Sequence, residues 1–569
     1  MAGRDMRRAA LLVLSMLSAC AANDFGFEDS SSSSRFQPTG TYGAYLTGRF
    51  AAKRADLDTA ADKLAQAARS TGLPDVVNQA FIAAVLAGRD DAAVLAATLP
   101  DNPVAQLVLA DRDAMAGRWT DAEARFAGLP QQGLTQVLRP MLMAWAQAGQ
   151  GRTSSALSTL GPYIDGGRLR GVMALHGAMI ADLGGQTADA ARLYRLAQAE
   201  YGGLNLRLGI VLASWQARSG YVTEAQRIIR DVAGAGGELG MARLALEADV
   251  SQRAIRSATD GLAEAYLALG ATLRQQDAAD TAQILVQLAL TMRPDFTAAR
   301  LLLSDMQISA RRPRAALDTL APVASDDPLV AMVRLRQAAL HDGLGETDQA
   351  AGMLAELGRQ YPDRPEPLAQ AGEILRRTGR YKEAVATFDG AIGRVGAPSR
   401  NNWILFYERG IASERAGDWE RAEADFQTAL ALAPEQPAVL NYLGYAWTER
   451  GQNLVQARQM IERAVQQRPN DGSFIDSLGW VLLRAGDAPG ALKNLQRAVE
   501  LQPEDAVING HLGDAMAAVG RWREAEYQWR RALLLKPEPE DADRINQKLA
   551  TLPQVRAPAQ ASVPAPTVR

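Results

Sequence analysis

The chain has 569 residues, of which 47% are hydrophobic and 22% are charged, and its formal net charge is −3. This composition provides enough apolar side chains for a large core and excludes a chain that is disordered throughout. A protein whose main partner is nucleic acid usually has a basic surplus, which is missing here. One cysteine and three histidines exclude a disulfide framework and argue against a metal site, so we expect no metal and no cofactor.

The first twenty residues combine a basic start, a short apolar run and the single cysteine of the chain. The apolar run, residues 9–16, is too short to span a bilayer as a stable helix. Small residues then lead to Cys20, whose thiol can take a lipid. This pattern resembles the signal of bacterial lipoproteins, which implies that residues 1–19 are removed and that Cys20 is lipidated. The alternative is an ordinary secretory signal with an incidental cysteine.

The residues that follow the signal predict how the protein is held at a membrane. Ala21 stands directly after Cys20. By resemblance to lipoprotein sorting in Gram-negative bacteria, a residue other than Asp at this position implies the outer membrane, facing the periplasm. The serine-rich segment 20–40 predicts a flexible tether, and the Pro- and Ala-rich segment 551–569 predicts a disordered tail. The mature protein is therefore expected to be anchored to a membrane without spanning it.

Between these ends, small residues recur with a period close to 34 residues. In the C-terminal part the anchor glycines are Gly410, Gly444, Gly479 and Gly513. An alanine, a large apolar residue, a second alanine and a proline follow each anchor at similar offsets, and a second glycine follows seven residues after the first. This spacing predicts two helices per unit, with small residues at their crossing and a glycine that ends the first helix. Because one pair cannot bury its apolar face alone, successive units are expected to stack.

These residue types at these offsets resemble the tetratricopeptide repeat (TPR) family, which implies an all-α solenoid of stacked helical pairs. The register extends upstream through Gly270, Ser304, Ala338 and Gly372, and a weaker match reaches Gly48. We expect about 14 pairs in total. They form an irregular N-terminal array over residues 41–260 and a regular C-terminal array over residues 261–550. A Gly-rich patch at 234–240 is expected to interrupt the solenoid.

No catalytic arrangement is evident in the sequence. The zinc-protease motif H-E-x-x-H, the P-loop and the nucleophile elbow G-x-S-x-G are all missing from it. The three histidines, His176, His341 and His511, fall in separate units. We therefore predict that the chain is not an enzyme, although an unrecognised site in the N-terminal half stays an alternative. The arginines around Trp522 and Trp529 are interpreted as a solvated face and not as a nucleic-acid site.

The remaining candidate is the concave face of the stack, which the first helix of each pair is expected to line. The predicted partner-binding residues on this face are Tyr407, Asn441, Tyr445, Asp476, Trp480, Arg484 and Asp514. Amide and carboxylate groups can bond the backbone of an extended peptide, and aromatic rings offer rigid apolar area. The alternative is that the aromatic rings pack between helices. TPR proteins that grip a peptide C-terminus use a clamp rich in lysine and asparagine, and this sequence lacks the lysines.

Three related motifs distinguish the segment 441–529 from a generic repeat. They read Asn-Tyr-Leu-Gly-Tyr at 441–445, Asp-Ser-Leu-Gly-Trp at 476–480 and His-Leu-Gly-Asp at 511–514. Together with the lipoprotein signal, they resemble the C-terminal repeats of bacterial TPR outer-membrane lipoproteins. That resemblance implies an adaptor for a periplasmic carboxyl-terminal processing serine protease and its substrates, including peptidoglycan hydrolases. The alternative is a structural scaffold for exopolysaccharide or peptidoglycan synthesis and export machinery.

Overall fold

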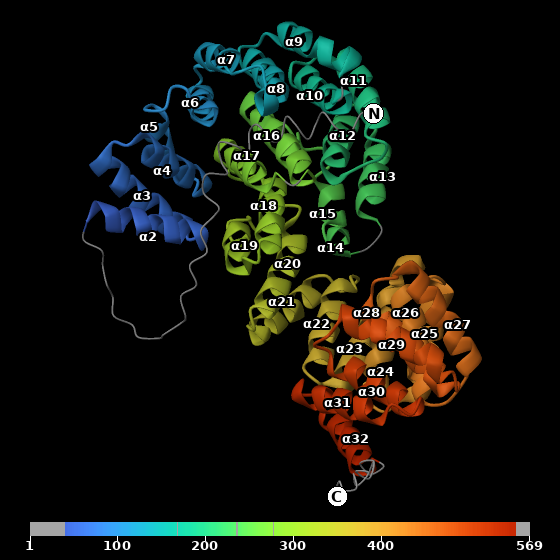
Figure 1. Ribbon diagram of the computed structural model, residues 1–569. Helices are drawn as coiled ribbons and strands as arrows, with labels where there is room; N and C mark the ends of the chain where they lie inside the picture. Colours follow the sequence, from blue (N-terminus) through green and yellow to red (C-terminus); the bar gives the residue numbers. More distant parts are fainter. Residues whose placement is uncertain (1–39, 168, 235–236, 277, 553–569) are drawn as a thin grey trace, which may run out of the picture. The chain divides into compact units, whose positions relative to one another are not determined.

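The structure is a computed structural model that describes residues 40–167, 169–234, 237–276 and 278–552. The predicted signal peptide, Cys20, nearly all of the predicted tether and most of the predicted tail lie outside these residues. Within them, every regular element is a helix (Figure 1). None of these described helices is both long and apolar enough to cross a bilayer. The chain divides into two compact units, unit 1 up to Tyr361 and unit 2 from Pro362.

Unit 1 is built from helices that pack pairwise along the chain. Its helices are α2 (Thr41–Lys53), α3 (Leu57–Thr71), α4 (Pro74–Leu86), α5 (Ala92–Ala96), α6 (Pro103–Met115), α7 (Trp119–Ala127), α8 (Gly133–Gly149), α9 (Thr153–Gly166), α10 (Arg170–Leu183), α11 (Thr187–Glu200), α12 (Leu206–Arg218), α13 (Val222–Ala233), α14 (Gly237–Gly240), α15 (Arg243–Ala248), α16 (Ala258–Arg274), α17 (Ala279–Met292), α18 (Thr297–Ser309), α19 (Pro313–Leu320), α20 (Val330–Gly343) and α21 (Thr347–Gln360).

Unit 2 continues the same pairwise packing. Its elements are α22 (Glu366–Arg377), α23 (Tyr381–Gly393), the short 3-10 helix η2 (Arg400–Asn402), α24 (Trp403–Arg415), α25 (Trp419–Leu432), α26 (Pro437–Glu449), α27 (Leu454–Gln467), α28 (Gly472–Arg484), α29 (Ala488–Leu501), α30 (Ala506–Ala518), α31 (Trp522–Leu534) and α32 (Pro539–Ala550). In the described part of the chain, six pairs run from α2 to α13 and eight from α16 to α31. The predicted all-α repeat solenoid is confirmed, and the short helices α14 and α15 fall at the Gly-rich interruption.

The close crossing of the two helices in each pair depends on the small anchor residue. A Cβ atom added at Gly410 would lie 2.7 Å from the Phe426 ring, and one added at Gly479 would lie 2.5 Å from Leu495. The second glycine of the unit takes a left-handed backbone conformation where the first helix ends, with φ of 89° at Gly486. Both roles predicted from the repeat spacing are confirmed in these units. First helices of successive pairs contact one another, and we call the surface that they form the first-helix face.

Helix α16 departs from this simple order, because it also packs on the first-helix face of the repeats before it (Figure 1). The hydroxyl group of Tyr266 on α16 donates to Oδ1 of Asp111 on α6 at 2.8 Å. Gly261 leaves room for the indole of Trp145 on α8, which a Cβ atom at this position would overlap. Trp145 Nε1 in turn donates to Nδ1 of His176 on α10 at 2.9 Å. One helix of the chain thus occupies the first-helix face of α6, α8 and α10.

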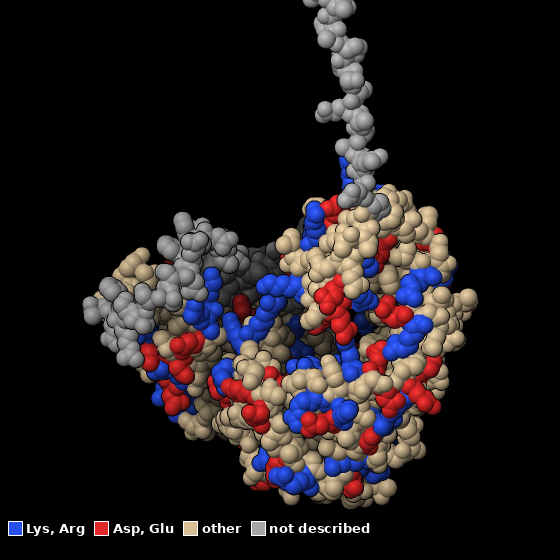
Figure 2. Space-filling model, turned by 90° about the horizontal axis from the view of Figure 1, so that it is seen from below, with Lys and Arg blue, Asp and Glu red and all other residues tan. Residues whose placement is uncertain are grey.

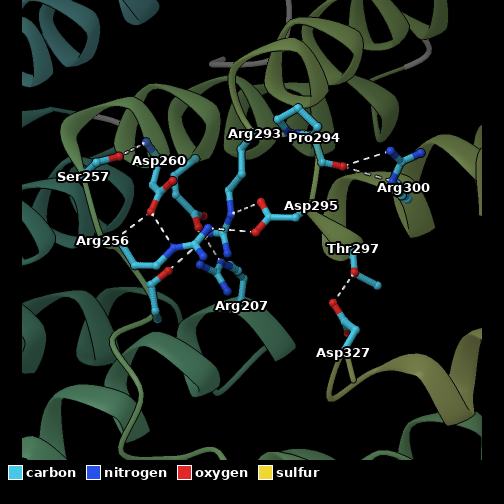
Figure 3. A network of polar contacts seen from close by, with 12 residues as sticks. Arg207, Arg256, Ser257, Asp260, Arg293, Pro294, Asp295, Thr297, Arg300 and Asp327 are labelled. Atoms are coloured by element: carbon cyan, nitrogen blue, oxygen red, sulfur yellow. Dashed lines mark hydrogen bonds and ion pairs between the residues drawn. The ribbon is translucent and has the colours of Figure 1, made fainter. Parts of the chain in front are cut away.

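The beginning of α16 is fixed by a polar network (Figure 3). The backbone N–H group of Arg256 donates to Asp260 at 2.7 Å, and its guanidinium group pairs with Asp295 at 2.8 Å. Glu264 pairs with Arg207 of α12. Asp260 and Glu264 are both buried, and a buried carboxylate is tolerated only where hydrogen bonds and opposite charge replace its water. The network therefore compensates the charges that α16 brings into the core.

Helix α16 joins the repeats before and after residue 260 into one core. The apolar core of unit 1 runs from Ala44 to Leu340 without a break, since α16 and α17 pack against α4, α6, α8 and α10. The predicted boundary near residue 260 therefore separates two stretches of repeats inside one compact unit. The two compact units are divided between Tyr361 and Pro362. Helix α16 is apolar on most of its sides and therefore has to be buried. Its anchor residue, Gly270, fits the repeat register, so the sequence alone does not show that α16 also contacts α6, α8 and α10.

The buried contact between Asp111 and Tyr266 predicts a pH-dependent stability of unit 1. Burial raises the pKa of the Asp111 carboxyl group to about 8, so this group is neutral in the folded protein at neutral pH. The unfolded chain holds the same proton only below about pH 4, so the stability of unit 1 falls as the pH rises from about 4 to about 8, by at most about 1.4 kcal/mol per pH unit.

Asp111→Asn keeps a neutral acceptor for Tyr266 and removes this titration. We expect the variant and the wild type to unfold at nearly the same temperature below about pH 4, where the Asp111 carboxyl group is protonated in both the folded and the unfolded chain. At about pH 8 the variant is expected to unfold at the higher temperature. Thermal unfolding followed by circular dichroism measures this difference. A difference that stays constant across the range would contradict a buried, neutral Asp111.

Candidate functional site

The first-helix face of unit 2 brings several of the predicted residues together around His511. The imidazole ring of His511 on α30 stacks on the indole of Trp480 on α28, with centroids 4.1 Å apart and planes 15° apart. Its Nδ1 lies 3.0 Å from both carboxylate oxygens of Asp476. The ring of Tyr445 on α26 lies 6.3 Å from the imidazole, and Trp480 Nε1 donates to Glu449. First helices of three successive repeats therefore build one polar and aromatic cluster.

Carboxylates decide the charge of this cluster. Burial alone would lower the pKa of His511, but Asp476, followed by Asp514 and Glu449, raises it above its ordinary value. The imidazole therefore keeps its proton to a higher pH than a free histidine does. A protonated ring stacked on Trp480 gains a cation–π interaction as well as an ion pair with Asp476. The cluster is an imidazole ring held between an indole and a carboxylate.

Helix α32 supplies two further cations to the same face. Asp514 accepts hydrogen bonds from Lys548 Nζ at 2.7 Å and from Trp529 Nε1 at 2.8 Å. The guanidinium group of Arg544 lies 3.8 Å from Glu449. Helix α32 thus takes the place of the first helix of a further repeat and covers the end of the face.

The other predicted residues lie around this cluster without joining it. Tyr407 packs in an aromatic group, with its ring 6.1 Å from that of Phe426 and 5.9 Å from that of Tyr442. Burial raises the pKa of Tyr407 to about 12. Asn441 is half-buried, and its Oδ1 accepts no hydrogen bond from the described residues. The Arg484 guanidinium group lies 5.7 Å from the Trp480 ring, and the side chain is exposed.

Several residues of the cluster could have been found by following the repeat register further. The sequence predicts no role for His511, because a lone histidine on a helix carries no chemical signal. It nevertheless lies 35 residues after Asp476, close to one repeat period. Lys548 lies 34 residues after Asp514, which places it on the same face one unit later. What the sequence cannot show is that Trp480 is 9% exposed and already in contact with His511 and Glu449.

The surface chemistry of the chain is mixed. Acidic and basic side chains are interspersed over the face seen in Figure 2. Among the described residues, no group of three or more His, Cys, Asp or Glu side chains is placed to hold a metal ion. The arrangement on unit 2 is one of aromatic rings, buried ion pairs and exposed arginine, which suits the binding of a polypeptide segment.

Three segments of the chain, residues 335–400, 407–472 and 477–543, match the family model described as "Tetratricopeptide repeat". These segments are therefore tetratricopeptide repeats, as their residue spacing predicts. Such repeats indicate a scaffold that binds other proteins.

Curated relatives share parts of this chain. It is 28% identical over 182 residues to the TPR repeat-containing protein PA4667 of Pseudomonas aeruginosa, over 32% of this chain and 30% of that protein. It is 35% identical over 138 residues to human tetratricopeptide repeat protein 13, over 24% of this chain and 15% of that protein. It is 30% identical over 115 residues to the cellulose synthase operon protein C of Xanthomonas axonopodis pv. citri, over 20% of this chain and 7% of that protein. The chain spans less than a third of the length of these relatives.

Solved structures of repeat proteins are also similar to the chain. The Cut9–Hcn1 hetero-tetramer of APC/C shares 15% identity over 90% of both chains, with a TM-score of 0.38. YrrB, described as a TPR protein with an unusual peptide-binding site, shares 20% identity over 31% of this chain and 89% of that chain, with a TM-score of 0.27. The fold class of this chain follows from its own helices.

The coupling between His511 and Asp476 can be measured directly. Asp476→Asn removes the carboxylate that contributes most to raising the pKa of His511 and leaves the burial that lowers it. We expect that pKa to be raised above its ordinary value in the wild type and to fall in the variant. The wild-type pair stabilises unit 2 fully below about pH 6.5, and this contribution is lost as the pH rises through the raised pKa.

Nuclear magnetic resonance of the imidazole protons follows this titration. The chain has three histidines, so the signal that disappears in His511→Gln identifies the residue. A pKa that is the same with and without the Asp476 carboxylate would contradict the described contact.

Proposed function

We propose that unit 2 binds a segment of a protein partner on its first-helix face. The observation that carries this proposal is the way unit 1 holds α16. There, Asp111 and Trp145 contact α16 from the position directly after the small anchor residue of each first helix. The equivalent positions in unit 2 are occupied by Tyr445, Trp480 and Asp514. In unit 1 an aspartate and a tryptophan at this repeat position hold α16. Unit 2 therefore has the same repeat position filled by the same kinds of side chain, aromatic rings and an aspartate.

The residues of the face define what such a segment should contain. Asn441 is half-buried on this face and its Oδ1 is enclosed, so a contact with the partner would be made by the rest of its amide group. The exposed guanidinium group of Arg484 matches a carboxylate, since its planar fork bonds two oxygens at once. The half-buried ring of Tyr445 at the edge of the cluster offers rigid aromatic area. A segment with an acidic side chain and an apolar anchor fits this combination.

For the whole chain we propose a non-catalytic adaptor, anchored by a lipid on Cys20 to the outer membrane and facing the periplasm. Its proposed partners are a carboxyl-terminal processing serine protease and the cell-wall hydrolases that the protease degrades. The signal at residues 1–20 and the motifs within 441–529 support this role. An adaptor works by effective concentration, because two partners held on one scaffold meet far more often than in free solution.

A second candidate is a structural scaffold for exopolysaccharide or peptidoglycan synthesis and export machinery. The similarity over 115 residues to cellulose synthase operon protein C favours this candidate. Both candidates use the first-helix face of unit 2 and differ in the proteins that it recruits.

Affinity purification from detergent-solubilised envelopes, followed by mass spectrometry, tests the proposal. We expect a periplasmic serine protease and cell-wall hydrolases to be enriched with the wild-type chain. The double variant Asn441→Ala with Arg484→Glu changes the half-buried and exposed edge of the face and spares the buried stack on His511. We expect it to lose one partner by about tenfold, the effect of removing a few well-placed polar contacts.

Arg458→Glu on α27 is the matched control, because it reverses an exposed charge away from the first-helix face. It is expected to retain all partners. Recovery of synthesis and export proteins without a protease would support the scaffold candidate instead. Equal recovery of every partner by the wild type and the double variant would contradict binding at this face.

A further inference from the structure

The first described helix, α2, exposes large side chains and buries small ones. On α2, Tyr42 is 74% exposed, Leu46 is 50% exposed and Phe50 is 58% exposed. The residues that α2 buries are Ala44, Gly48 and Ala51. A terminal repeat normally shows a polar outer face, because no further repeat covers it. Helix α2 therefore shows the opposite of the pattern expected for a helix that faces water.

The three exposed side chains form one stripe with basic residues at its end. Their spacing of four residues places them on the same side of the helix. Helix α2 contains no acidic residue, and Lys53 and Arg54 are exposed where it ends. The Arg54 guanidinium group lies 4.6 Å from the centre of the Phe50 ring. Apolar area and positive charge thus lie side by side.

The opposite end of the array is capped in the usual way. Helix α32 buries Ile545 and exposes polar side chains. Those exposed on it include Glu540, Asp543, Asn546 and Gln547. The apolar stripe is therefore a property of α2 and not a general feature of how this chain ends its repeats.

We propose that the stripe Tyr42, Leu46 and Phe50, with Lys53 and Arg54, docks on the surface of an anionic lipid bilayer. A helix with aromatic and aliphatic residues next to lysine and arginine has the composition of an interfacial helix. The apolar side chains enter the boundary between headgroups and acyl chains, and the basic residues pair with lipid phosphates. The helix lies in the plane of the surface and does not cross it.

The position of α2 in the chain supports a bilayer as the occupant. It is the first described helix after Cys20, and this part of the argument rests on the proposed lipid anchor. The tether that the sequence predicts after Cys20 would have an average end-to-end distance of roughly 25 Å. The anchor would then hold α2 close to the bilayer at high effective concentration, so a weak interfacial contact suffices. Docking of α2 would turn a loose attachment into a defined orientation of the first repeat on the membrane.

Vesicle flotation tests docking without the lipid anchor. The protein used is residues 21–569, which include every described residue and omit the signal and Cys20. Vesicles of phosphatidylcholine mixed with phosphatidylglycerol are compared with vesicles of phosphatidylcholine alone. We expect binding to the mixed vesicles that weakens with added salt. The variant Leu46→Ser with Phe50→Ser is expected to reduce binding by about tenfold or more, because two large apolar side chains no longer enter the interface.

The control variant is Val455→Ser with Leu534→Ser, which removes two exposed apolar side chains from α27 and α31. It is expected to bind vesicles like the wild type, and circular dichroism checks that both variants stay folded. No binding to mixed vesicles, or equal binding by both variants, would overturn the docking of α2. That result would leave partner binding by unit 2 intact. Release of the full-length Cys20→Ser chain from membranes by a salt wash tests the lipid anchor separately.

Discussion

The apolar face of each helical pair in this chain is buried only when a neighbouring element covers it. The small anchor residues allow the two helices of a pair to cross closely, and the large residues at the crossing, such as Phe426 and Leu495, then point toward the neighbouring helix. This constraint propagates the array from pair to pair. Where no further repeat covers an apolar surface of the array, the same requirement means that something else has to cover that surface.

Unit 1 meets this constraint with its own chain. Helix α16 is both a repeat helix and the occupant of the face formed by α6, α8 and α10, and its carboxylates are compensated by the network around Arg256 and Arg207. Unit 2 has a corresponding face, on which His511, Trp480 and Asp476 form a cluster and α32 closes one end. Beyond this cluster, Arg484 is exposed and Asn441 and Tyr445 are half-buried, and this open edge of the face is the physical basis for assigning partner binding to unit 2.

The sequence predicts the fold well because the repeat is a local pattern. Steric crowding or backbone conformation restricts certain repeat positions to small residues, and their regular spacing is visible in the sequence. Examples are the glycine that precedes Trp480, the alanines at the helix crossings and the glycines with positive φ. Contacts between distant repeats leave no such regular spacing. Tyr266 and Asp111 lie 155 residues apart, and nothing in either neighbourhood predicts their hydrogen bond. For the same reason the stacking of His511 on Trp480 and the exposure of Phe50 emerge only from the three-dimensional arrangement.

The central claim is that a partner contacts the first-helix face of unit 2. Site-specific photo-crosslinking in living cells tests it most directly, with a benzophenone amino acid placed at Arg484 on that face or at Val455 on α27. Both positions are exposed, so the reporter is tolerated without repacking the core. The account predicts a crosslinked protein partner from position 484 and none from position 455. Crosslinks from position 455 alone would contradict it.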